Sequence, residues 1–216
     1  MSRVVVGMTG ASGAAVALQV LELLKQTSAE VHLVVSKWGA VNLEHECGIT
    51  VRSLRSLVHT VHSDRDLAAP LSSGSFRCES TLIVPCSART LGAVANGSGD
   101  TLISRAADVA IKERRRLVLA LREAPLSSIH LRNALQLSDA GAVVYPLVPT
   151  FYANPGDVDQ LTEQIAAKLV DLCGFETPAL PRWSESVDLT RKTRTKNGAR
   201  GIPSYDASPE SGNVPE

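Results

Sequence analysis

The stretch "VVVGMTGASG", which begins at Val4, constrains the fold of this chain more than any other. An apolar run there ends in three spaced glycines with two small hydroxyl residues between them. These residues are Gly7, Thr9, Gly10, Ser12 and Gly13. Glycines at the end of a strand allow a tight turn and a close approach of the backbone to a ligand, and hydroxyl groups beside them can bond an anion. The stretch therefore predicts a buried strand followed by a phosphate-binding loop.

Apolar runs alternate with helical patterns along the rest of the chain, which indicates a parallel sheet with helices on both faces. We expect strands at residues 3–8, 30–36, 80–87, 116–121 and 142–149. The third of these is expected to break at Pro85, which has no amide for regular pairing. Helices are expected at residues 14–26, 37–48, 88–97, 101–114, 127–141 and 158–174. The polar segment from Thr50 to Ser80 is expected to hold loops and short helices.

Composition limits the classes of protein to consider. With 216 residues, 44% of them hydrophobic, the chain is expected to form one domain over residues 1–183, followed by a polar tail over residues 184–216. The 22 basic residues balance the 22 acidic ones, so no overall field attracts nucleic acid or an anionic membrane. The four cysteines form no CxxC pair, which argues against a zinc site or a disulfide framework. Without a signal or membrane-spanning pattern, we expect a cytoplasmic protein.

Polar residues follow four of the expected strands, at the edge where doubly wound sheets bind their ligands. They are Gly10, Ala11 and Ser12, then Ser36, then Ser87, Ala88, Arg89 and Thr90, and finally Arg122 and Glu123. Hydroxyls, helix-start amides and guanidinium groups suit a phosphate with a polar ring system. The glycine spacing departs from GxGxxG and no acidic residue closes the second strand, which favours a mononucleotide such as FMN over NAD. Tight turns and capping serines would explain any one of these groups, but explain all four less well.

A second cluster lies in "SRAADVAIKERRRLVLALREAP". Arg105 and Lys112 are seven residues apart and so project from one helix face, with Asp108 between them. This face is either solvated, with Asp108 neutralising both cations, or a cationic pocket for a second phosphate. Glu123 favours the pocket, because a carboxyl group at a strand end beside Arg122 is suited to general acid/base catalysis.

Four further residues are candidates on weaker grounds. Tyr152 ends a loop, Lys168 lies on the last amphipathic helix, Trp183 precedes the polar tail and Glu46 lies on a short helix. From spacing alone, ordinary surface or packing roles account for them better than contacts with a substrate.

The motifs together resemble a known family. "MTGASG", "VSKW", "SSGSF", "PCS", "RAADVAIKERRRLVL", "REAPLSSIHL" and "GAVVYPLVPTFY" are similar to the UbiX-like flavin prenyltransferases, which include small subunits associated with phenolic acid decarboxylases. The resemblance runs in order from about Val4 to Trp183. It implies a Rossmann-like, flavodoxin-like three-layer fold, and transfer of a dimethylallyl group from dimethylallyl phosphate, or the diphosphate, to N5 and C6 of reduced FMN. It also implies a homododecamer with active sites at subunit contacts, no metal, and a product that serves a UbiD-like decarboxylase.

The resemblance also implies roles for individual residues. FMN would be held by Gly10, Ala11, Ser12, Ser36, Ser87, Ala88, Arg89, Thr90 and Arg122. The prenyl phosphate would be surrounded by Arg105, Lys112, Arg122, Tyr152 and Lys168, with Trp183 covering the prenyl chain. The reaction itself would depend on Glu123, Ser12, Glu46 and Lys112. Lys168 stands where the family more often has arginine, so a point charge replaces a bidentate grip on phosphate.

Two other functions remain open from the sequence. One is an FMN-dependent cysteine decarboxylase, although "PCSART" stands where that family has an asparagine-containing motif. The other is a non-catalytic FMN carrier subunit of a decarboxylase, although holding FMN requires neither Lys112 nor Glu123.

Overall fold

A six-stranded sheet forms the centre of the molecule, whose computed structural model describes residues 2–151 and 154–178. The strands are β1 (Arg3–Met8), β2 (Glu30–Val35), β3 (Thr60–Ser63), β4 (Ser80–Cys86), β5 (Arg116–Leu121) and β6 (Val143–Pro146). They lie in the order β3-β2-β1-β4-β5-β6, and all neighbouring pairs are parallel. The chain crosses from one half of the sheet to the other between β1 and β4, where a doubly wound fold binds its ligands.

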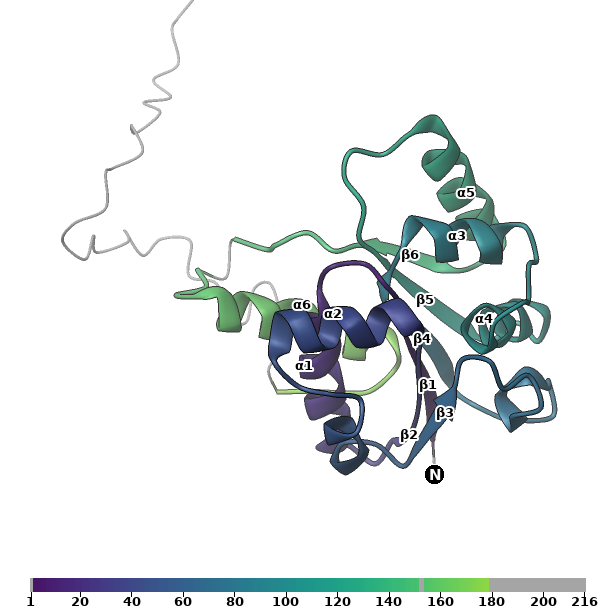
Figure 1. Ribbon diagram of the computed structural model, residues 1–216. Helices are drawn as coiled ribbons and strands as arrows, with labels where there is room; N and C mark the ends of the chain where they lie inside the picture. Colours follow the sequence, from purple (N-terminus) through teal and green to yellow (C-terminus); the bar gives the residue numbers. More distant parts are fainter. Residues whose placement is uncertain (1, 152–153, 179–216) are drawn as a thin grey trace, which may run out of the picture.

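Helices cover both faces of the sheet (Figure 1). One face carries α1 (Ala14–Lys25), α2 (Lys37–Cys47) and α6 (Val158–Leu172), and the other carries α3 (Ala88–Ala95), α4 (Leu102–Lys112) and α5 (Ser128–Asp139). Two short 3-10 helices, Ser53–Ser56 and Pro70–Ser72, lie in the connection between α2 and β4. The expected three-layer α/β fold with a parallel sheet is confirmed.

The central strand β1 shows why its sequence is apolar throughout. Val4 and Val6 pack into the core under α1 and α6, whereas Val5 packs into the core under α3 and α4. At Gly7 a β-carbon would stand 3.1 Å from a side-chain carbon of Ile103, so the missing side chain lets α4 approach the sheet. A strand that is covered on both faces cannot alternate between apolar and polar residues.

Two features differ from the sequence-based expectation. Residues 60–63 form the edge strand β3, which the polar pattern did not predict because Thr60 and Ser63 are exposed. Strand β4 is irregular around Pro85 as expected, because the register shifts between Ile83 and Cys86, but it continues to Cys86, which still pairs with Leu121. Within the described part of the chain, no helix is both long and apolar enough to cross a bilayer.

Candidate functional site

Backbone hydrogen bonds join the carboxyl ends of four neighbouring strands. They run from the amide of Ser36 to the carbonyl of Met8 (2.9 Å), from Thr9 to Pro85 (3.3 Å) and from Arg122 to Cys86 (3.0 Å). The residues predicted to follow these strands therefore lie along one edge of the sheet. We call Gly10–Ser12, Ser36, Ser87–Thr90, Arg122 and Glu123 the strand-end cradle.

Thr9 holds the centre of this edge together. Its hydroxyl donates to the carbonyl of Pro85 at 2.6 Å and accepts from the amide of Ser87 at 2.9 Å. The residue is 3% exposed. The expectation that the Thr9 hydroxyl bonds an anion is therefore not met, because both of its contacts serve to connect β1 with β4.

The glycine loop packs against α2. A β-carbon at Gly10 would overlap with the β-carbon of Trp38, so only glycine fits where the loop passes the helix. The side-chain amide of Asn42 donates to the carbonyl of Ala11 at 3.0 Å, while Ser12 is exposed beside it. The loop is therefore open to solvent at Ser12, which leaves its backbone accessible to a nucleotide.

Glu46 caps the helix that follows this loop. One of its carboxylate oxygens accepts from the amides of Gly13 (2.9 Å) and Ala14 (2.7 Å). The N-cap of α1 is Gly13, whose φ of 114° suits glycine and which has no side chain to cap the helix. A helix start without its own capping side chain is the signal that could have assigned this role to Glu46.

Ser36 and Ser87 are both N-cap residues. The hydroxyl of Ser36 accepts from the amide of Gly39 (3.0 Å), and that of Ser87 accepts from the amide of Thr90 (3.3 Å). The hydroxyls are therefore engaged in starting α2 and α3. Amides of a first helical turn have no partner within their own helix, so the helix starts are the groups that suit an anion.

Arg122 and Glu123 follow β5 at the same edge. Arg122 is exposed, and its guanidinium makes no ion pair with any residue that the structure describes. The carboxylate of Glu123, which is half-buried, accepts from the amide of the next residue, Ala124, at 3.2 Å, and has no other partner among the described residues. A guanidinium and a carboxylate thus follow one another along the chain at the end of the cradle.

The second predicted cluster lies elsewhere. Helix α4 ends at Lys112, just before β5 begins at Arg116, whereas Glu123 follows the carboxyl end of the same strand. At about 3.3 Å per residue, β5 alone separates the two ends by roughly 16 Å. One chain therefore does not bring Lys112 and the strand-end cradle together.

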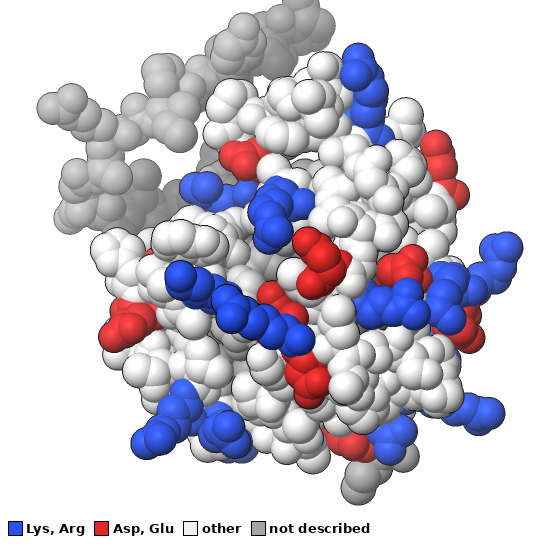
Figure 2. All heavy atoms as spheres, turned by 45° about the vertical axis from the view of Figure 1, so that its right-hand side comes forward, with Lys and Arg blue, Asp and Glu red and all other residues white. Residues whose placement is uncertain are grey.

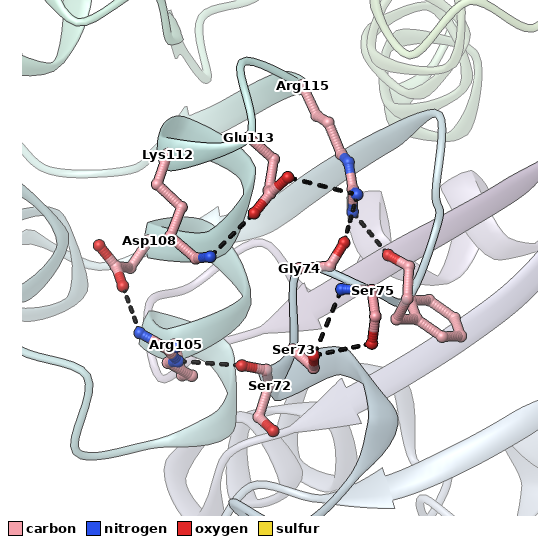
Figure 3. Close-up of polar contacts among 10 residues, drawn as sticks. Ser72, Ser73, Gly74, Ser75, Arg105, Asp108, Lys112, Glu113 and Arg115 are labelled. Atoms are coloured by element: carbon pink, nitrogen blue, oxygen red, sulfur yellow. Dashed lines mark hydrogen bonds and ion pairs between the residues drawn. The ribbon is translucent and has the colours of Figure 1, made fainter.

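Each cation on α4 has its own carboxylate (Figure 3). A guanidinium nitrogen of Arg105 lies 2.6 Å from Asp108, and Nζ of Lys112 lies 2.9 Å from Glu113. The alternative in which Asp108 neutralises both cations is wrong in one respect, because Lys112 pairs with Glu113 instead. The hydrogen bond from Lys112, followed by its charge and that of Arg115, lowers the pKa of the Glu113 carboxyl. We call Arg105, Asp108, Lys112, Glu113 and Arg115 the α4 cluster.

Of the other candidates, Lys168 lies apart from both groups. Nζ of Lys168 is 3.0 Å from Asp171 on α6, on the opposite face of the sheet from α4. Arg89 lies 4.0 Å from Asp100 at the exposed start of α3. On the side of the molecule that Figure 2 draws, basic side chains likewise lie beside acidic ones. Tyr152, Trp183 and the expected tail lie outside the described residues.

The cradle fits a mononucleotide such as FMN on the chemistry of its donors. The starts of α2 and α3 offer backbone amides, and Arg122 offers a guanidinium without an ion-pair partner among the described residues. The amides at the start of α1 are already bound by Glu46, so they are not among these donors. The donor set is suited to one phosphate group.

Comparisons with known proteins agree on one family. The model of the Flavoprotein family matches residues 1–173. The flavin prenyltransferase PAD1, mitochondrial, of Saccharomyces cerevisiae is 44% identical over 181 residues, which cover 84% of this chain and 75% of that protein. The crystal structure of AnUbiX (PadA1) in complex with FMN and dimethylallyl pyrophosphate is similar, with a TM-score of 0.82 and 47% identity over 84% of this chain and 97% of that one. A dodecameric FMN-dependent UbiX-like decarboxylase from Escherichia coli O157:H7 also has a TM-score of 0.82, with 42% identity over 84% of this chain and 98% of that one.

Proposed function

This chain belongs to the UbiX-like flavin prenyltransferases, and we propose that it joins the dimethylallyl group of dimethylallyl phosphate to N5 and C6 of reduced FMN. The observation that carries this proposal is the single edge at which four strand ends meet, with Arg122 and Glu123 beside the helix starts. Bound FMN supplies the nucleophilic nitrogen and carbon that accept the prenyl group. The residues of the chain hold the reactants, move protons and stabilise the leaving phosphate.

The strand-end cradle holds FMN in this proposal. Gly10, Ala11 and Ser12 let the backbone approach the ligand, and the helix starts at Ser36 and Ser87 direct amides toward its edge of the sheet. The first turn of α3, which contains Ala88, Arg89 and Thr90, adds further donors, and Arg122 adds a charge.

Glu123 is the proton-transfer residue. The phosphate leaves with the electron pair of the broken C–O bond as the first bond forms, and the prenyl double bond takes up a proton as the second bond forms. Glu123 would deliver a proton to the departing phosphate and accept the one released at C6. Ser12 and Glu46 stand at the reacting edge of the flavin, where Glu46 keeps the glycine loop in place through the start of α1.

Arg105, Lys112, Tyr152 and Lys168 surround the donor phosphate, and Trp183 covers its prenyl chain. Fixed positive charge stabilises a leaving phosphate, and an apolar wall keeps water away from an allylic cation. Since Lys112 lies at the opposite end of β5 from the cradle, a second copy of the chain is needed to bring the two together. We therefore propose a dodecamer with sites at subunit contacts, and the dodecameric relative from E. coli supports this.

The remaining parts of the proposal concern the setting of the reaction. The product, prenylated FMN, is passed to a UbiD-like decarboxylase in the cytoplasm. The yeast relative carries "mitochondrial" in its name, so the compartment is a property of the individual protein rather than of the fold.

Anaerobic incubation tests this function directly. The purified protein is mixed with reduced FMN and either dimethylallyl phosphate or the diphosphate, and the released flavin is weighed by mass spectrometry. We expect a flavin heavier by one five-carbon unit with the monophosphate. Unmodified flavin with both donors, from protein that binds FMN, would overturn the proposal and favour an FMN carrier.

A further inference from the structure

The segment from Ser72 to Phe76, which contains the "SSGSF" motif, runs in front of the α4 cluster (Figure 3). Its backbone is extended at Ser73, with φ of −112° and ψ of 139°. Alternate carbonyls of the segment accept hydrogen bonds from two arginines that flank it. Nε of Arg105 donates to Ser72 O (3.0 Å), and the guanidinium of Arg115 donates to Gly74 O (2.6 Å) and Phe76 O (2.5 Å).

Arg115 is committed to this segment. Its side chain is 17% exposed, and two of its nitrogens are bound to the carbonyls of Gly74 and Phe76. A third contact places the guanidinium 3.9 Å from the Glu113 carboxylate. The Arg115 guanidinium is therefore bound by other groups of the protein and largely shielded from solvent. The side chains of Arg105 and Lys112 are more accessible, at 36% and 46% exposed.

Gly74 shows how closely the segment and the cluster fit. A β-carbon at this position would clash with the Glu113 carboxylate and would stand 3.1 Å from Nζ of Lys112. Gly74 is not among the glycines with positive φ, so a larger residue here would disturb the Glu113 and Lys112 side chains rather than the backbone. The Lys112–Glu113 pair thus lies directly against the backbone that Arg115 holds.

The same segment also orients Arg105. Ser72 O accepts from its Nε and Asp108 accepts from a terminal nitrogen, so two contacts fix the plane of the guanidinium. A guanidinium carries five N–H donors, and those left over point in a direction that these contacts set. Fixed donors bind a phosphate group more tightly than mobile ones, because less side-chain freedom is lost when the group binds.

We propose that Arg115 is a positioning residue for the donor phosphate: by holding Ser72–Phe76 it fixes Arg105 and Lys112 in the arrangement that binds this group. The inference rests on the proposed function, in which Arg105 and Lys112 bind the phosphate. Arg115 itself touches neither reactant and acts through the segment and through Glu113.

The variant Arg115→Lys tests the proposal, with Arg116→Lys as its matched control. Lysine keeps the charge but cannot hold two carbonyls in a fixed plane. Arg116 is the next residue and is exposed, its guanidinium lies beside Gly174, and its side chain forms no hydrogen bond or ion pair with the residues that the structure describes. We expect R115K to raise KM for dimethylallyl phosphate about tenfold, with a smaller change in kcat and an unchanged Kd for FMN. R116K should resemble the unchanged protein in all three constants.

Gly74→Ala disturbs the same arrangement of Lys112 and Glu113 without altering any charge. It should also raise KM for the donor while FMN binding stays the same, because the Lys112–Glu113 pair must move. If R115K does not fold, the result with G74A decides. An unchanged donor KM in the folded variants would overturn the inference, whereas absence of prenylated flavin from the unchanged protein would overturn the proposed function instead.

Discussion

The strand-end cradle and the α4 cluster both suit phosphate groups, but the first is made largely of backbone amides and the second of charged side chains. The cradle offers helix starts and backbone amides, whose positions follow from the hydrogen bonds between β1, β4 and β5. The α4 cluster offers long charged side chains, each paired with a carboxylate and held against the Ser72–Phe76 segment. A site made of backbone is fixed by the fold itself, whereas a site made of side-chain charges needs additional contacts to fix it.

The largest expected effect is a loss of turnover without a loss of FMN binding when one residue of the cradle is changed. Glu123→Gln removes the carboxylate at the end of β5, which we propose as the proton-transfer group, but keeps its shape. We expect turnover to fall by about 10²- to 10⁴-fold, the usual contribution of a general acid or base. FMN binding, followed by fluorescence titration, should be retained. A carrier protein would be indifferent to this change, so normal product formation by E123Q would contradict the assigned role.

A mixing experiment asks whether the cradle and the α4 cluster of one site come from different chains. Glu123→Gln and Lys112→Ala each inactivate the protein alone, but co-expression of the two produces mixed oligomers. If neighbouring subunits share a site, about a quarter of the sites in a random mixture combine two unaltered surfaces, and activity returns. No recovery in oligomers shown to contain both chains would mean that each site lies within one chain.

The next largest effect is expected from salt, which should weaken ligand binding at the α4 cluster more than at the strand-end cradle. Screening weakens exposed charges, since the Debye length falls from about 10 Å at 0.1 M to about 3 Å at 1 M salt. We expect KM for dimethylallyl phosphate to rise several-fold across this range, and Kd for FMN to change less. Initial rates and fluorescence titrations at each salt concentration measure the two constants. Equal salt dependence of both constants would remove the distinction between the regions.

A smaller effect concerns the stability of the cradle. Glu46→Ala leaves the amides of Gly13 and Ala14 without their acceptor, and loss of a helix cap costs about 1 kcal/mol of unfolding free energy. Glu44→Ala is the matched control, because Glu44 lies on the same helix, is exposed, and forms no side-chain hydrogen bond with the described residues. Urea denaturation compares the two variants. Equal stability would mean that the cap contributes nothing measurable.

The smallest expected effect is the response of the α4 cluster to acid. Lys112 lowers the pKa of the Glu113 carboxyl below its ordinary value of 4.5 in the folded protein. Its stabilising contribution is therefore present above pH 4.5 and is lost as the pH falls through the lowered folded value. We expect Glu113→Gln to be slightly less stable than the unchanged protein at neutral pH, with the difference closing in acid. Thermal melts between pH 3 and pH 7 check this, and a difference that widens in acid would contradict the sign.

The sequence predicted the cradle well because its signals are local. Each candidate residue directly follows a strand, and strand ends of a parallel sheet meet at one edge. Strand β3 was missed for the opposite reason: it lies at the edge of the sheet, and its exposed Thr60 and Ser63 resemble a loop.

Contacts between distant parts of the chain could not be predicted in this way. Thr9 reaches Ser87 across 78 residues, and Glu46 reaches Gly13 across 33. The bonds from Arg115 to the carbonyls of Phe76 and Gly74 span 39 and 41 residues. In each case the residue type permits many partners, and only the packing of the layers selects one.

The carboxylate at the start of α1 has a consequence for the length of nucleotide that the fold accepts. In dinucleotide-binding sheets the pyrophosphate sits at the start of the first helix. Here the amides of Gly13 and Ala14 already hold the negative charge of Glu46. A pyrophosphate brought to this position would meet a like charge and find the amides of Gly13 and Ala14 already bonded, so NAD and FAD are disfavoured. The Glu46 carboxylate thus competes with a pyrophosphate for these two amides, which favours a nucleotide with a single phosphate.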